Sequence, residues 1–467
     1  MKPRQILILI GILALLLAGV FFRQRQKPAQ LVTEEYTPLD LSFDANSVGK
    51  ILIYKGKLGE KKNPDEYVEM TKSKEGQWQI SSLWGARADQ DKVTSFLEAI
   101  RKAKGEQRGK GKQIFKDFGI ADEEAFHVSI ANLSGKDLLS LALGIKKAGD
   151  TPTFIRKSAA ETVYLTDANL FGQIGIYSDP AKETAKSDFW ASMQIVQFDG
   201  TKIQSIETKR FMNNQEIVTT HLSRKETQRW KALREGLPFE IDSGKISQFL
   251  NDIKTWRAQK VLDPKAKDYG FAKPKWQMRF ELEGGGDILL TSGDIDEKAK
   301  LVYLHVSNEP VVFELSRYYF ENMDVDDSHF FTDNPLGIDP DKIEKLVIHS
   351  DKKEMSFNPK GKKWDSLTQY LENSKNFRPL RLLFDPADQK KVSGKIWIEI
   401  QKQGEASKFL EVGEVLSAEP RKNLNGEAME KEYAASMRGK TQPFAIPESV
   451  FKQFFENIDN LAEPKKS

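Results

Sequence analysis

One short pattern occurs three times along this chain of 467 residues. "DANSVGKILIYK" begins at Asp44, "DGTKIQSIETKR" begins at Asp199 and "DPDKIEKLVIHS" begins at Asp339. Each copy has Val or Ile four residues after the Asp and Ile or Leu three residues later. The Asp can cap a single helical turn, and the apolar residues can anchor that turn on a core before a strand begins. The pattern therefore predicts the same opening turn for three similar domains.

The same landmarks follow each motif in the same order. A second strand leads to a Trp, which is Trp78, Trp230 or Trp364. Residues 89–105 and 242–259 then show the i, i+3, i+4, i+7 spacing of an amphipathic helix opened by Asp or Ser. The two apolar faces are Val93, Phe96, Leu97 and Ile100, and Ile246, Phe249, Leu250 and Ile253.

The third segment departs from this pattern in two places. Residues 367–383 carry a weaker helical pattern, which Pro379 interrupts. The first two segments have "DFGI" and "DYGF" after the helix, where Gly119 and Gly270 suit a left-handed turn position. The third has "LLFDPADQ" in place of that turn.

Alternating apolar and polar residues then predict antiparallel hairpins with one buried face, followed by a last strand and a short helix. The three motifs start 155 and 140 residues apart, a spacing too long for a solenoid and suitable for duplicated domains. We therefore predict an α+β fold with three duplicated, mainly antiparallel β domains, each with a packed helix. The predicted boundaries are residues 38–193, 194–333 and a divergent third repeat, 334–461.

The N-terminus is expected to be a membrane anchor, residues 1–27, followed by a linker, residues 28–37. Residues 6–22 are apolar, and 17 uncharged residues are at the short end of what spans a bilayer. A cleaved signal peptide is the alternative. However, no Ala-x-Ala site is evident and "RQRQK" follows the apolar run at once. We therefore expect one transmembrane helix in contact with membrane lipid, with the body outside the cytoplasm.

Charge and composition exclude some classes of protein. The net charge is +3, but five cations flank the apolar segment, which leaves −2 for the rest of the chain. No electrostatic footprint for nucleic acid is present. With no Cys in the sequence, thiol catalysis is excluded, although the redox compartment stays undecided.

The aromatic–Gly turns "FGIADEEAFHVSI" and "YGFAKPKWQMRF", with a V-x-x-I strand, a Trp strand and a helix before them, resemble a bacterial family known as domain of unknown function 4340. The resemblance covers most of residues 39–171 and recurs more weakly towards the C-terminus. Members of this family are often encoded beside subunits of a gliding-motility-type ABC transport system. The resemblance implies a role in the cell envelope, at the bacterial inner membrane with the body in the periplasm, and assigns no catalytic residue.

Three segments invite a chemical interpretation. "DFG" occurs in kinases, but no "HRD" loop accompanies it here, and "DYG" repeats it at the same place in the second repeat. The basic run 101–113 could bind phosphate but lacks the phosphate-loop pattern, so we expect a solvated loop. "DVDDSHFF", residues 324–331, clusters possible metal ligands but lacks the Gly and distal Glu of a calcium loop. We expect a polar linker with helix capping by Asp.

The remaining candidate catalytic groups are scattered. His127, His221, His305 and His349 are expected in strands as ordinary sheet residues, and no Gly-x-Ser-x-Gly motif occurs. Paired carboxylates stay open, because glycosidase acids and bases follow no spacing rule. We predict no catalytic, cofactor-binding or metal residue.

Two functions remain after these exclusions. The first is a non-catalytic binding or scaffolding component of the envelope, accessory to an ABC-type transport system, with a transporter permease or another envelope protein as partner. The alternative is an envelope hydrolase acting on glycans, with Asp and Glu residues at a junction between repeats. Repeated domains present extended surfaces, which favours the first.

Overall fold

The computed structural model of the protein describes residues 36–58, 66–146, 152–212, 215–226, 228–350, 353–358, 377–422 and 427–456. The predicted anchor, residues 6–22, lies outside the described residues. Among the residues that are described, no helix is long and apolar enough to cross a membrane. The chain divides into two compact units between Ala191 and Ser192.

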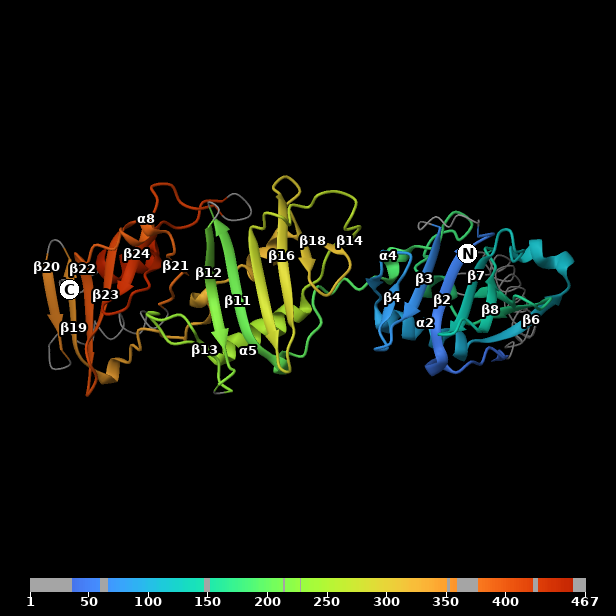
Figure 1. Cartoon of the computed structure of the whole chain (residues 1–467), viewed down its shortest axis with the longest axis horizontal. Coiled ribbons are helices and arrows are strands. Elements are labelled where there is room, and N and C mark those ends of the chain that lie inside the picture. Colours follow the sequence, from blue (N-terminus) through green and yellow to red (C-terminus); the bar gives the residue numbers. More distant parts are fainter. Residues whose placement is uncertain are drawn as a thin grey trace, which may run out of the picture. The chain divides into compact units, whose positions relative to one another are not determined.

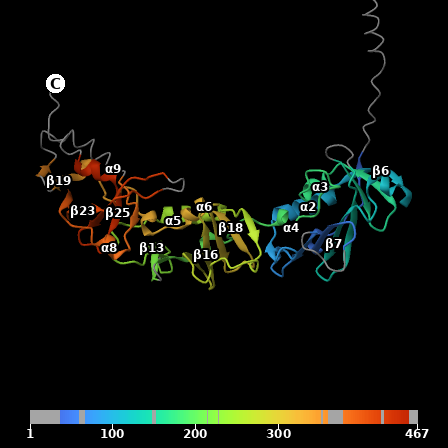
Figure 2. The same ribbon diagram turned by 90° about the horizontal axis from the view of Figure 1, so that it is seen from above.

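The first unit is built on one antiparallel sheet, with strand order β1-β6-β10-β9-β8-β7-β2-β3-β4-β5 (Figure 1). Its strands are β1 (Thr37–Pro38), β2 (Val48–Lys55), β3 (Tyr67–Lys72), β4 (Trp78–Ile80), β5 (Ala86–Arg87), β6 (Lys104–Lys110), β7 (Phe126–Asn132), β8 (Asp137–Leu143), β9 (Thr153–Lys157) and β10 (Thr162–Thr166). Helices α2 (Gln90–Lys102), α3 (Leu170–Gln173) and α4 (Ser187–Trp190) lie on one face of this sheet (Figure 2).

The second unit contains two sheets. The first has the order β13-β12-β11-β15-β16-β17-β18-β14. Its strands are β11 (Ile203–Met212), β12 (Gln215–Ser223), β13 (Lys231–Ala232), β14 (Lys260–Leu262), β15 (Trp276–Leu282), β16 (Asp287–Asp296), β17 (Leu301–Val306) and β18 (Val312–Ser316). Helices α5 (Ser243–Thr255) and α6 (Arg317–Met323) lie on one face of it (Figure 2).

The last sheet has the order β20-β19-β22-β23-β24-β25-β21. Its strands are β19 (Ile343–Ser350), β20 (Lys353–Phe357), β21 (Arg381–Leu382), β22 (Ile396–Lys402), β23 (Lys408–Val415), β24 (Glu432–Met437) and β25 (Phe444–Pro447). Short helices α8 (Pro386–Gln389) and α9 (Glu448–Phe451) accompany them. The predicted mainly antiparallel β architecture with a few helices is confirmed.

The three sheets share one strand order. In the first sheet, β3-β2-β7-β8-β9-β10-β6 has the same sequence of pairings as β12-β11-β15-β16-β17-β18-β14 and β20-β19-β22-β23-β24-β25-β21. The opening strands β2, β11 and β19 each shift register directly after their first apolar residue. These residues are Val48, Ile203 and Ile343. All three side chains are buried. The repeated sequence motif therefore marks one repeated bulge at the start of each sheet.

The Asp of the motif acts differently in the three repeats. Asp44 accepts a hydrogen bond from the Asn46 N–H at 3.0 Å, and Asp199 accepts one from the Thr201 N–H at 2.9 Å. These contacts confirm the predicted capping. Asp339 instead forms an ion pair with the Lys342 Nζ at 3.0 Å.

Helices α2 and α5 bury the predicted faces, because their apolar residues recur with the helical period. Trp78 and Trp230 are buried as well, whereas Trp364 lies outside the described residues. Most of the weaker helical pattern, residues 367–376, lies outside the described residues. Beyond the interrupting Pro379, Arg381 and Leu382 form strand β21.

The interpretation of residues 101–113 as a solvated loop is wrong. Residues Lys104–Lys110 form β6, which pairs with β10 and β1. The segment lacks alternating apolar residues, and its pairing depends on its neighbours instead. Gly105 makes this pairing possible, because a Cβ there would lie 2.6 Å from the Leu165 carbonyl oxygen.

A second use of glycine is common to all three sheets. Gly119 and Gly270 have the predicted left-handed conformation, with φ of +61° and +80°. Near each of them a second glycine has no room for a side chain, and the same close approach recurs in the third sheet. These glycines are Gly144, directly after β8, Gly293 in β16 and Gly413 in β23, where a Cβ would lie well below 3.0 Å from the carbonyl oxygen of Phe118, Tyr269 or Lys391, respectively. The third repeat therefore keeps this packing without the aromatic–Gly turn.

Candidate binding cleft between the second and third sheets

The segment predicted as a polar linker, residues 324–331, is packed where the two sheets of the second unit meet. Its middle forms the short helical turn η4 (Asp327–Phe330), which lies against β12, α5 and β21. A cleft of about 620 Å³ lies beside this segment. Side chains from both sheets of the second unit line the cleft.

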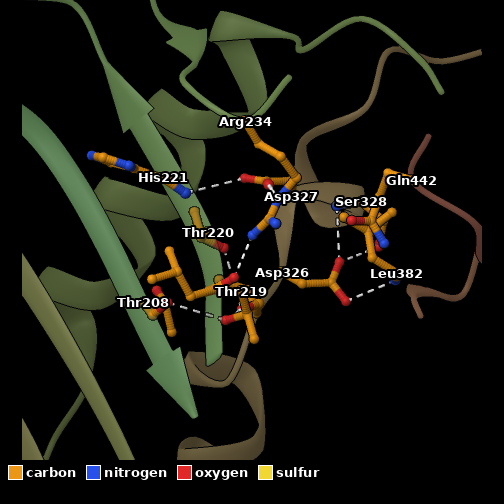
Figure 3. Close-up of polar contacts among 12 residues, drawn as sticks. Thr208, Thr219, Thr220, His221, Arg234, Asp326, Asp327, Ser328, Leu382 and Gln442 are labelled. Atoms are coloured by element: carbon orange, nitrogen blue, oxygen red, sulfur yellow. Dashed lines mark hydrogen bonds and ion pairs between the residues drawn. The ribbon is translucent and has the colours of Figure 1, made fainter. Parts of the chain in front are cut away.

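Asp326 joins the two sheets through backbone groups. One carboxylate oxygen accepts a hydrogen bond from the Ser328 N–H at 2.8 Å, which caps η4 as predicted. The other accepts one from the Leu382 N–H at 3.0 Å, in β21 of the last sheet (Figure 3). Because the side chain of Asp326 is only 4% exposed, both bonds are shielded from water.

Asp327 points the opposite way, towards the second sheet (Figure 3). It is fully buried, accepts a hydrogen bond from Arg234 Nε at 2.8 Å and another from the His221 N–H at 3.3 Å. Burial raises the pKa of Asp327 to about 6, although the Arg234 charge opposes this shift. The linker interpretation is therefore wrong for these two carboxylates, since both are buried and bonded.

Apolar contacts close the same junction. Phe239 precedes α5 and lies within 5.9 Å, centroid to centroid, of Phe331, Phe377 and Phe444. These rings belong to the core of the last sheet. The Gln442 N–H also donates to the Gly236 carbonyl at 3.1 Å. The second sheet thus contributes Phe239 to the hydrophobic core of its neighbour.

Five cationic side chains line the cleft. Arg210 and Lys245 come from β11 and α5, whereas Arg378, Arg381 and Arg421 come from the last repeat. Three carboxylates form ion pairs with these cations: one contacts a single cation, and each of the other two contacts two cations. Arg210 Nε lies 2.7 Å from Asp324, Lys245 and Arg378 lie 3.0 and 2.6 Å from Asp333, and Arg381 and Arg421 lie 2.9 and 3.2 Å from Glu432.

Residues 78–274 match the family described as "Domain of unknown function (DUF4340)". The chain contains a DUF4340 domain. The resemblance expected from the aromatic–Gly turns is thereby confirmed, although the match starts at Trp78, later than residue 39, and continues to residue 274. No curated protein and no solved structure matches the chain.

The DUF4340 match includes one side of the cleft. Arg210 and Lys245 lie within residues 78–274, and the cations of the last repeat lie beyond them. The match runs from β4 of the first repeat to the turn before β15 of the second. It therefore contains the Trp, the amphipathic helix and the aromatic–Gly turn of both repeats.

The acidic groups of the cleft are already engaged. Burial raises the pKa of Asp324, while Arg210 and Arg421 oppose the shift. His329 stands edge-on to Phe249 and Phe330, and burial lowers its pKa. In the part of the chain that the structure describes, no group of three or more His, Asp or Glu side chains could hold a metal ion.

Sequence reasoning placed the histidines correctly but missed the cleft. His127, His221, His305 and His349 lie in β7, β12, β17 and β19, as predicted. No site residue was predicted, and the five cations show no spacing that would join them. The usable signal was in "DVDDSHFF", where Val325 lies between two acids and the segment ends in the apolar pair Phe330 and Phe331, which indicates burial.

Proposed function

We propose that this protein is a non-catalytic binding or scaffolding component of the bacterial envelope, accessory to an ABC-type transport system. Residues 6–22 anchor it in the inner membrane by a single span, and the body lies in the periplasm. Its partner is a transporter permease or another envelope protein. The apolar, uncharged segment at residues 6–22 and the DUF4340 match support this proposal.

The main support for a non-catalytic role is that the carboxylates at the cleft are already bonded to other protein groups. Asp324 is bonded to Arg210, Asp326 to backbone N–H groups and Glu432 to two arginines. General acid–base catalysis needs a carboxyl group that can reach the substrate and exchange a proton with it. Groups committed to structural bonds fit a rigid binding surface better than a glycosidase pair.

The repeated architecture also supports binding. We propose that the repeats at residues 38–193, 194–333 and 334–461 arose by duplication of one domain, since their sheets share a strand order and a bulge position. Duplicated domains enlarge the surface offered to partners, whereas one active site needs a single copy.

Crosslinking in intact membranes tests the proposal. The full chain is isolated with its crosslinked neighbours, and an ABC-type permease is the expected partner. A reporter fused after Ser467 should be active only outside the cytoplasm. The hydrolase alternative predicts release of cell-wall fragments by the purified chain and loss of that release in Asp324→Asn. This outcome without a permease crosslink would overturn the proposal.

A further inference from the structure

The cleft between the second and third sheets has the size and the donors of an anion site. Its volume of about 620 Å³ falls within the range of small-molecule sites, roughly 300–1,000 Å³. Like charges repel, so gathering five cations from separate elements around one cleft needs compensating contacts. Two carboxylates that do not line the cleft, Asp333 and Glu432, provide these contacts.

Glu432 and Asp333 act as positioning residues. Glu432 is only 7% exposed and holds Arg381 and Arg421 side by side. Asp333 holds Lys245 and Arg378 together in the same way. A guanidinium has five N–H donors, and each of these contacts uses one or two of them. The remaining donors are available to a ligand.

The converging donors favour an anion, although the charges around the cleft are nearly balanced. The acid Glu321 in the lining contacts Arg317, which also pairs with Glu297, and Arg381 lies 4.0 Å from Asp388 as well as beside Glu432. The attraction for an anion therefore comes from guanidinium N–H groups that meet in a partly enclosed space, where electrostatic attraction is stronger than in bulk water.

We infer that this cleft binds a small molecule or headgroup that carries a phosphate or carboxylate group. Arginine pairs match the planar or tetrahedral oxygens of such groups through paired hydrogen bonds. The inference rests on the proposed binding function and names its ligand class. The cleft is local and the folded part of the chain has no cationic excess, so an extended nucleic acid strand does not fit it.

Calorimetric titration of the full-length chain tests the inference with three probes: inorganic phosphate, citrate, and glycerophosphoglycerol, the soluble headgroup of phosphatidylglycerol. At least one should bind saturably, with an affinity that falls as salt rises. Binding of glycerophosphoglycerol alone would indicate a lipid source. Binding of phosphate or citrate would indicate a soluble anion.

Variants separate this cleft from other basic surface. Arg378→Gln and Arg421→Gln each remove a half-exposed cation and should weaken binding about tenfold or more, the usual value of a charge-assisted hydrogen bond. Arg438→Gln is the matched control, since Arg438 is 47% exposed, has one carboxylate partner, Glu411, and is not among the side chains that line the cleft. Circular dichroism checks folding of each variant.

No saturable binding of any probe, or equal affinity in all three variants and the unsubstituted chain, would overturn the inference. The permease crosslink is a separate readout. Anion binding without that crosslink would remove the transporter proposal and leave the anion site. A permease crosslink without anion binding would overturn the anion site and leave the transporter proposal.

Discussion

The first and second repeats close with the same backbone contacts but with different side chains. In the first, Ala88 pairs with Ala191, and the Asp89 N–H donates to the Trp190 carbonyl at 2.8 Å. In the second, Ile241 pairs with Phe331, and the Asp242 N–H donates to the Phe330 carbonyl at 2.7 Å. The geometry that ends a repeat is thus constant.

The side chains at these positions have different consequences. Trp190 and Phe330 each pack edge-on against the helix of their own repeat, through Phe96 and Phe249. Phe331, however, also belongs to the core of the last sheet, where the first repeat has only Ala191 at the equivalent position. The compact units of the chain divide at Ala191 and not at Phe331. One closing element therefore becomes a junction when its side chains are large enough to enter a neighbouring core.

Of the substitutions considered, replacing Phe331 should lower the free energy of unfolding the most. Phe331→Ala gives this position the alanine that the first repeat has at the equivalent Ala191, and we expect a loss of about 3–5 kcal/mol in the free energy of unfolding of the second unit. Urea unfolding measures this loss. Leu133→Ala, at a 70% exposed position in the first unit, is the control and should change stability by less than about 0.5 kcal/mol. Equal effects of the two substitutions would break the comparison.

Removing Arg234, the cation that pairs with buried Asp327, should have the next largest effect. Arg234→Met leaves Asp327 buried without its charged partner, which should cost about 3 kcal/mol near neutral pH. The double variant Arg234→Met/Asp327→Asn should recover part of this loss, because no unpaired charge remains. Unfolding by urea at pH 7.5 provides both values. If the single and double variants were equally unstable, the ion pair would not be what holds this side of the junction.

The titration of Asp327 gives a pH-dependent prediction. Its pKa is raised from 3.8 to about 6 on folding, since burial disfavours the charged carboxylate. Between about pH 4 and pH 6 the folded chain binds a proton that the unfolded chain has released, so this contribution to stability falls as pH rises.

Asp327→Asn isolates this contribution. The stability of the unsubstituted chain minus that of Asp327→Asn should fall through this window by at most about 1.4 kcal/mol per pH unit. Subtraction removes the parallel contribution of Asp324, whose pKa is also raised. A flat or rising difference would contradict the assignment.

The smallest expected effects concern Asp89 and Asp242, the N-caps of α2 and α5. Asp89 accepts hydrogen bonds from two backbone N–H groups and Asp242 from one. Asp89→Ala and Asp242→Ala should each cost about 1 kcal/mol, and the first should cost more. Thermal unfolding followed by circular dichroism measures both. The reverse order would show that cap strength does not follow the number of bonds.

Periodic features of the fold could be predicted from the sequence, and context-dependent features could not. The faces of α2 and α5 follow from apolar residues at helical spacing, and the first two opening turns follow from the repeated Asp motif. Strand β6 has no such pattern, because Gly105 allows close approach to the Leu165 carbonyl oxygen and Gly109 leaves room for the Ile114 side chain. Its pairing with β10 depends on residues more than 50 positions away.

The cleft illustrates the same limit. The sequence predicts a polar linker with helix capping for Asp326 and Asp327, because their segment lacks the pattern of a calcium loop. Their burial depends on Arg234, His221 and Leu382, which are distant in sequence. Arg381 and Arg421 meet at Glu432 of β24, since β25 pairs with both β21 and β24, and no spacing in the sequence encodes that contact.

A crystal structure of the chain from residue 28 onward would test the repeated fold most directly. We predict that its three sheets superpose with one strand order, each with its first bulge immediately after Val48, Ile203 or Ile343. A third sheet whose strands pair in a different order, or lack that bulge, would contradict it.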